Sequence, residues 1–108
     1  MGLDFDDTIR IRKLVHTFNE KTLEANAALR KWMSAEMNLD KALILNKVKN
    51  SSAWTKQIIE LITTNPQYDN LHTDYHIGRL EEKCAINVLK AIEMEVNALK
   101  KIYDETPK

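Results

Sequence analysis

The sequence predicts an all-α protein, an antiparallel bundle of three helices or, with one further break, four. Apolar residues recur at spacings of three and four along most of the chain, and residues so spaced lie on one face of a helix. The 108 residues include only two glycines and two prolines, so few turns are expected. Alternating runs of β-branched residues, which indicate strands, are scarce. A chain of this length is typical of one domain, so we expect residues 1–108 to form a single helical bundle.

The first helix is expected over about residues 4–37. The Asp4 carboxylate can cap its first free amide groups, and Asp6 and Asp7 lie where the helix dipole is positive. The apolar face that follows keeps the helical period and consists of Ile11, Val15, Phe18, Ala25, Leu29 and Trp32. The first and last helices offer more apolar face than the shorter middle segment can cover, and we expect the uncovered strip to be an interface.

Two positions compete for the end of this first helix. The apolar period continues through Leu39 and Leu43, so a single helix to about Lys49 is one alternative. Such a helix would be far longer than average, which favours an earlier break. We therefore expect a turn at Asn38–Asp40, where Asn can adopt a left-handed conformation and Asp can cap the next helix. Asn50–Ser52, three poor helix formers in a row, is the rival boundary or a kink.

The second helix is expected over about residues 40–64, interrupted at 50–52 if the bundle has four helices. Its apolar face consists of Trp54, Ile58, Leu61 and Ile62. Pro66 follows this segment, and a proline disfavours the helical conformation at the residue before it, here Asn65. The break between the second and third helices is therefore expected at this proline.

The third helix is expected over about residues 69–105, capped by Asp69 or Asn70 and followed by Pro107. It carries the most regular apolar row of the chain, which consists of Ala85, Leu89, Ile92, Val96, Leu99 and Tyr103. A second row lies beside the first and consists of Ile77, Leu80, Cys84, Val88 and Ala91. A stripe this wide needs helices on more than one side. Gly78, near the start of the helix, either permits close packing against a neighbour or marks fraying of the first turns.

The charge balance and the cysteine content exclude several classes of function. Sixteen basic and sixteen acidic residues give a formal net charge of zero, so no long-range field attracts nucleic acid or an anionic membrane, and self-association meets little repulsion. The single cysteine, Cys84, allows no internal disulfide, and its place on the apolar row predicts a small buried side chain. The N-terminus lacks the apolar stretch of a signal peptide, and no segment is apolar enough to span a membrane. We therefore expect a cytoplasmic protein without membrane contact.

His72 and His76, four residues apart near the start of the third helix, share one face and could together hold a zinc, nickel or copper ion. Two ligands do not complete a site, and solvated histidines near a polar loop are the simpler interpretation, so we assign no cofactor. The sequence contains no Glu-x-x-His pair of a di-iron bundle, no Gly-x-Ser-x-Gly turn and no glycine-rich phosphate loop. Without an acid–base pair or nucleophile at workable spacing, we expect that the protein is not an enzyme.

Arg10, Arg12 and Lys13 form a basic cluster and are the candidate residues for nucleic-acid binding. Acidic residues of the same helix, among them Asp7 and Glu20, offset much of their attraction for phosphate. Nucleic-acid binding is therefore disfavoured, and an accessory role of this kind is the third hypothesis.

The two tryptophans and the methionines near the first of them are the most promising residues for partner binding. Core packing is the default for a tryptophan, but surfaces that carry Trp and Met suit adaptable binding. The expected partner-binding residues are Trp32, Met33, Met37, Trp54 and Tyr103. We expect a small non-enzymatic bundle that binds another protein, as a homodimer or as a regulator of a larger partner, through an apolar groove between its first and last helices. A small-ligand or metal-binding bundle built on the two neighbouring histidines is the second hypothesis.

Overall fold

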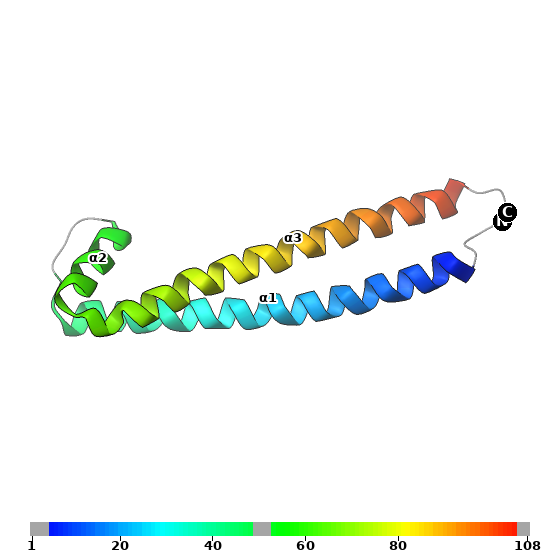
Figure 1. Ribbon diagram of the computed structural model, residues 1–108. Helices are drawn as coiled ribbons and strands as arrows, with labels where there is room; N and C mark the ends of the chain where they lie inside the picture. The colour runs from blue at the N-terminus through cyan, green and yellow to red at the C-terminus, as the bar shows by residue number, and fades with distance from the viewer. Residues whose placement is uncertain (1–4, 49–52, 106–108) are drawn as a thin grey trace. The chain divides into compact units, whose positions relative to one another are not determined.

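The computed structural model describes residues 5–48 and 53–105, and the regular secondary structure within them is helical (Figure 1). The elements in chain order are α1, Phe5–Leu45; α2, Trp54–Thr64; the short 3-10 helix η1, Pro66–Tyr68; and α3, Asp69–Glu105. The prediction of an all-α protein with three helices is confirmed, and α1 packs against α3. The break at Pro66 and the extent of the last helix are as predicted.

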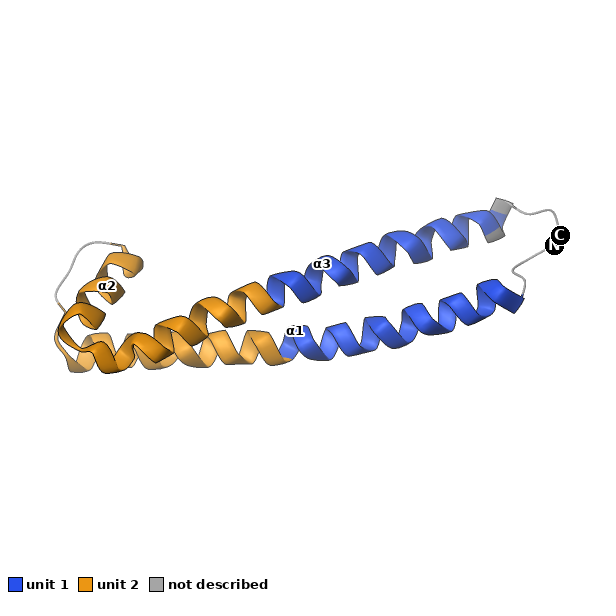
Figure 2. Ribbon diagram, viewed as in Figure 1, with its two compact units in different colours: residues 1–26, 82–108 blue, residues 27–81 orange. Residues whose placement is uncertain are grey.

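The chain divides into two compact units (Figure 2). Unit 1 contains α1 as far as Asn26 and α3 from Glu82 onward. Unit 2, Ala27–Glu81, contains the rest of α1, all of α2 and η1, and the start of α3. In each unit the α1 and α3 segments run in opposite directions (Figure 1). Among the described residues, two helices therefore build unit 1, whereas three build unit 2.

The expected turn at Asn38–Asp40 is wrong, because α1 runs through it without a break. Leu39 is 0% exposed, and Ala35 and Ala42, about one turn away on either side, are buried with it. A turn here would take Leu39 out of the core, so tertiary packing outweighs the weak helix propensity of the polar residues around it. The second helix accordingly begins at Trp54 rather than near residue 40.

After its last turn, α1 ends in a left-handed conformation at Lys47, whose φ angle is 53°. The backbone N–H of Val48 donates to the carbonyl oxygen of Leu43 at 3.0 Å, and that of Lys47 donates to Ile44 at 3.1 Å. These two hydrogen bonds define a Schellman motif, and Val48 adds its usual apolar contact by packing against the core of unit 2. The alternative boundary at Asn50–Ser52 lies outside the described residues.

The conformation of Lys47 leads to a prediction about stability. A side chain in the left-handed region costs roughly 1–2 kcal/mol, a cost that glycine avoids. We expect Lys47→Gly to raise the free energy of unfolding by about 0.5–1 kcal/mol in urea denaturation, because glycine loses part of this gain to its freer unfolded chain. The matched control is Lys41→Gly, at an exposed position inside α1, where glycine should lower stability by about 1 kcal/mol. Destabilisation by both substitutions would contradict the left-handed cap.

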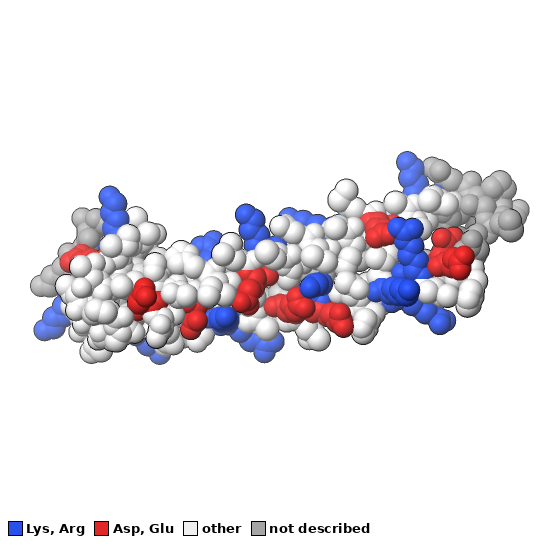
Figure 3. Space-filling model, viewed as in Figure 1, with Lys and Arg blue, Asp and Glu red and all other residues white. Residues whose placement is uncertain are grey.

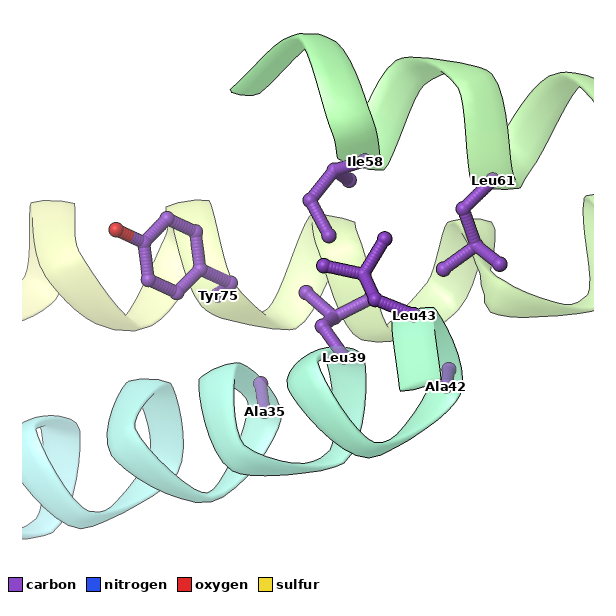
Figure 4. Close-up of a cluster of buried hydrophobic side chains, with 7 residues drawn as sticks. All are labelled: Ala35, Leu39, Ala42, Leu43, Ile58, Leu61 and Tyr75. Carbon is purple, nitrogen blue, oxygen red and sulfur yellow. The ribbon is translucent and has the colours of Figure 1, made fainter. Parts of the chain in front are cut away.

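All three helices contribute to the core of unit 2 (Figure 4). Its buried side chains are Ala35, Leu39, Ala42 and Leu43 of α1, Ile58 and Leu61 of α2, and Tyr75 of α3. In Figure 4 the two α2 side chains point toward those of α1. Leu39, Ile58 and Leu61 are fully buried, so the predicted apolar face of the Trp54–Thr64 segment does cover its neighbours.

Gly78 allows α1 and α3 to approach closely within unit 2. A Cβ atom at this position would lie 2.9 Å from Trp32 Cβ, 3.0 Å from the Trp32 backbone nitrogen and 3.2 Å from the Ala28 carbonyl oxygen. These atoms belong to the backbone of α1 or are fixed to it, so they cannot rotate away. The close-packing interpretation of Gly78 is therefore confirmed, and α3 is helical on both sides of it.

Only one of the two apolar rows on α3 is buried. Ala85, Ile92 and Leu99 of the first row are buried, as predicted. Every residue of the second row is exposed, namely Ile77, Leu80, Cys84, Val88 and Ala91. The expectation that further helices cover this second row is wrong, and so is the expected burial of the Cys84 side chain. The reason is that α1 packs on the first row and α2 is only 11 residues long.

Candidate interaction surface

An open apolar groove of about 230 Å³ lies between α1 and α3 within unit 1. Its lining residues are Leu14, Val15 and Phe18 of α1 and Ile92, Glu93, Val96 and Asn97 of α3. Apart from Glu93 and Asn97, the lining is aliphatic or aromatic. The groove can therefore exclude water from an apolar side chain that enters it, with polar groups available along the α3 side.

Helical periodicity places the lining residues on facing sides of the two helices. Leu14 and Phe18 are four residues apart on α1, and Ile92 and Val96 are four apart on α3, so each pair lies on one helix face. Ile92 is buried, whereas Val15 remains 51% exposed. Val15 is therefore part of an apolar strip that the two helices leave uncovered, because a pair of helices cannot cover the edge of its own apolar stripe.

The difference between the two units explains the groove. In unit 2, Ile58 and Leu61 of α2 complete the core formed with α1 and α3 and are themselves 0% exposed. In the described part of unit 1 there are only two helices, and none of its large apolar side chains is fully buried. An apolar face left open by two helices is the kind of surface that further helices bury in a bundle.

Trp32 and Trp54, two of the predicted partner-binding residues, lie together in unit 2. Both are half-buried against its core, and their rings flank Tyr75 with centroid distances of 5.9 and 4.9 Å. The Trp54 indole N–H also donates to a carboxylate oxygen of Asp40 at 2.7 Å. These contacts give both tryptophans a role in packing, which is the default interpretation of their place in the sequence.

Met33 and Met37, also predicted to bind a partner, lie one turn apart on α1 with 48% and 59% of their surfaces exposed. They are accessible to a partner, whereas the two tryptophans are partly buried against the core of unit 2. The side chain of Tyr103, the fifth predicted residue, lies outside the described side chains. The predicted set therefore separates into a packed tryptophan pair and an exposed methionine pair.

The structure brings His72 and His76 into direct contact. Their Nε2 atoms are 2.8 Å apart, and the two rings meet edge to face with centroids 4.4 Å apart. Partial burial, and then the neighbouring His76 ring, lower the pKa of His72, while the Asp69 carboxylate opposes part of that change. Among the described residues, no three His, Cys, Asp or Glu side chains are grouped closely enough to hold a metal ion. The pair therefore offers two ligands, with no third from the described residues.

Arg10, Arg12 and Lys13, the candidate nucleic-acid ligands, do not act as one free basic cluster. Arg10 forms an ion pair with Glu95 across unit 1, whereas Arg12 and Lys13 are exposed. On the face shown in Figure 3, Lys and Arg side chains lie among Asp and Glu side chains along both units. The mixture of signs agrees with the zero net charge of the sequence.

Sequence reasoning predicted a groove between the first and last helices but did not identify its lining residues, and it missed the cluster around Tyr75. The Arg79 guanidinium donates to the Tyr75 hydroxyl at 2.8 Å and lies 5.6 Å from the centre of the Trp32 ring. The spacing of four between Tyr75 and Arg79 is a sequence signal for the first contact, because such residues are neighbours on a helix. No comparable signal joins Trp32 to them, since it comes from a distant part of the chain.

Comparison of the chain with protein-family models, with curated proteins and with solved structures finds no match. Over residues 5–48 and 53–105, no helix combines the length and the apolar composition that crossing a bilayer requires. The groove in unit 1 and the surface side chains of the chain itself are therefore the basis on which a function can be assigned.

Proposed function

We propose that this protein is a non-enzymatic interaction module that self-associates through the groove of unit 1. The observation that carries the proposal is an apolar groove open to solvent on a pair of helices that has no third helix among its described residues. Burial of apolar surface is the main driving force for association, and this face has apolar surface to bury.

A second copy of unit 1 is the occupant that suits the groove. Two such units placed groove to groove would form a four-helix bundle, in which each helix pair covers the apolar face of the other. Homodimers related by a two-fold axis use the same patch on both copies. Here the patch contains a groove and an exposed apolar side chain at its edge, Val15, so Val15 of each copy can pack into the groove of the other.

Charges beside the groove also favour a two-fold contact. Arg12 is exposed and lies three residues before Val15 on the same side of α1, while Glu93 lines the groove on α3. A two-fold arrangement can bring Arg12 of one copy to Glu93 of the other, twice per dimer. The zero net charge of the chain adds no long-range repulsion between copies.

The test is to place a carboxylate at the edge of the groove. We expect Val15→Glu to weaken dimerisation in sedimentation equilibrium by at least about tenfold, or about 1.4 kcal/mol, because the new carboxylate would lose its hydration in an apolar contact. The matched control is Leu23→Glu, which also replaces an exposed apolar residue of α1 in unit 1 but does not line the groove. Circular dichroism checks that both variants remain helical.

The two variants together discriminate between surfaces. Dimerisation that is unchanged in Leu23→Glu and weakened in Val15→Glu would support the groove as the contact. Equal dimerisation in Val15→Glu and in the unmodified chain would show that copies meet elsewhere. An unmodified chain that stays monomeric would contradict self-association and leave a different helical protein as the partner to seek.

A further inference from the structure

The contact between His72 and His76 has a geometry that matters for metal chemistry. The two residues lie four apart in the first two turns of α3, and their Nε2 atoms, which are metal-binding atoms of imidazole, converge to 2.8 Å. Rings that share a face of a helix do not have to turn toward each other, but these do. At this distance one Nε2–H donates a hydrogen bond to the other Nε2. When that proton moves to Nδ1 of its own ring, both Nε2 lone pairs are available to one ion and the two rings form a bidentate ligand set.

The separation of the nitrogens selects a type of metal ion. With metal–nitrogen bonds of about 2.0–2.1 Å, nitrogens 2.8 Å apart subtend an angle of about 85° at the metal. That angle is close to the right angle between neighbouring positions of a square-planar or octahedral ion and well below a tetrahedral angle. We propose that His72 and His76 form a binding site for a nickel(II) or copper(II) ion, with water in its other coordination positions.

The surroundings of the pair hold it in place and favour a cation. Tyr75, between the two histidines in sequence, is buried against Trp32 and Trp54, and its ring centre lies 5.2 Å from that of His76. This packing fixes the start of α3, so the ligands need little ordering when the ion binds. The Asp69 carboxylate, which acts on the His72 ring, adds a negative charge beside the site.

The site is independent of the proposed self-association, because the histidines belong to unit 2 and the groove belongs to unit 1. Binding of the ion can therefore be measured whether or not the protein dimerises. Nickel(II) is the better probe, since copper(II) can oxidise the exposed thiol of Cys84.

The experiment is isothermal titration calorimetry of the full chain with nickel chloride at neutral pH. We expect one ion per chain, and we expect His72→Gln or His76→Gln to weaken binding by roughly 100-fold, because either change leaves a single ligand and removes the chelate effect. The matched control is His16→Gln. This third histidine pairs with Glu20 at 2.9 Å instead of with another histidine, so its loss should leave the affinity unchanged.

Three outcomes would overturn the proposal. One is the absence of nickel binding by the unmodified chain. Another is unchanged affinity when either histidine of the pair is replaced in a variant that circular dichroism shows to be folded. The last is a loss of affinity in His16→Gln as large as that in the pair variants. Tighter binding of zinc than of nickel would contradict the coordination angle, since zinc favours tetrahedral sites.

Discussion

Leu39→Ala is expected to lower the free energy of unfolding by about 3–5 kcal/mol, the upper part of the range for buried leucines. Leu39 is fully buried where α1, α2 and α3 meet in unit 2, so its removal leaves a cavity that all three helices line. Ile58 and Leu61, which are fully buried in the same cluster, cannot move into the space without exposing their own surfaces. Urea denaturation at a fixed protein concentration measures the change.

The control for this prediction is Leu23→Ala on the same helix. Leu23 is largely exposed, so the same chemical change should alter stability by no more than about 0.5 kcal/mol. If both substitutions had equally small effects, the core of unit 2 would not be packed as described, and the continuity of α1 through Asn38–Asp40 would lose its physical reason.

Gly78→Ala is expected to destabilise the protein although alanine is the better helix former. The new methyl group would meet Trp32 Cβ at 2.9 Å and the Trp32 backbone nitrogen at 3.0 Å, so α1 and α3 would have to separate in unit 2. Overpacking of this kind costs about 1–3 kcal/mol, against a gain of about 1 kcal/mol in helix propensity. Because the opposing atoms are fixed to the backbone of α1, we expect the clash to outweigh the gain.

A larger side chain at the same position should make the effect unambiguous. Gly78→Leu cannot be relieved by a shift of a few tenths of an ångström, and its loss of stability in thermal unfolding should exceed that of Gly78→Ala. A rise in melting temperature for Gly78→Ala would mean that the two helices part without cost, and it would contradict the close approach at this glycine.

The helical class and several of its boundaries could be predicted because they depend on local chemistry. Pro66 restricts the residue before it whatever surrounds it, and the first apolar row of α3 keeps its period over several turns. The continuation of α1 past Asn38–Asp40 could not be predicted in this way. It depends on Leu39 meeting Ile58 and Leu61, which are distant in sequence. The cap at Lys47 has no sequence signal either, since glycine is the usual residue in that conformation.

The candidate site was harder to predict than the fold for a related reason. Periodicity shows which face of a helix is apolar, but it does not show how many neighbours cover that face. Val15 and Cys84 both lie on apolar rows, yet both are exposed, because α2 belongs to unit 2 and is short. The His72–His76 pair was visible in the sequence, because a spacing of four on a helix is enough to bring two rings together.

Native mass spectrometry of the unmodified chain over a range of concentrations measures its self-association directly. If copies associate through unit 1, a species of twice the 12.5 kDa chain mass should appear, and its share of the signal should grow with protein concentration. A spectrum that contains only the 12.5 kDa species at every concentration would show that the chain does not self-associate.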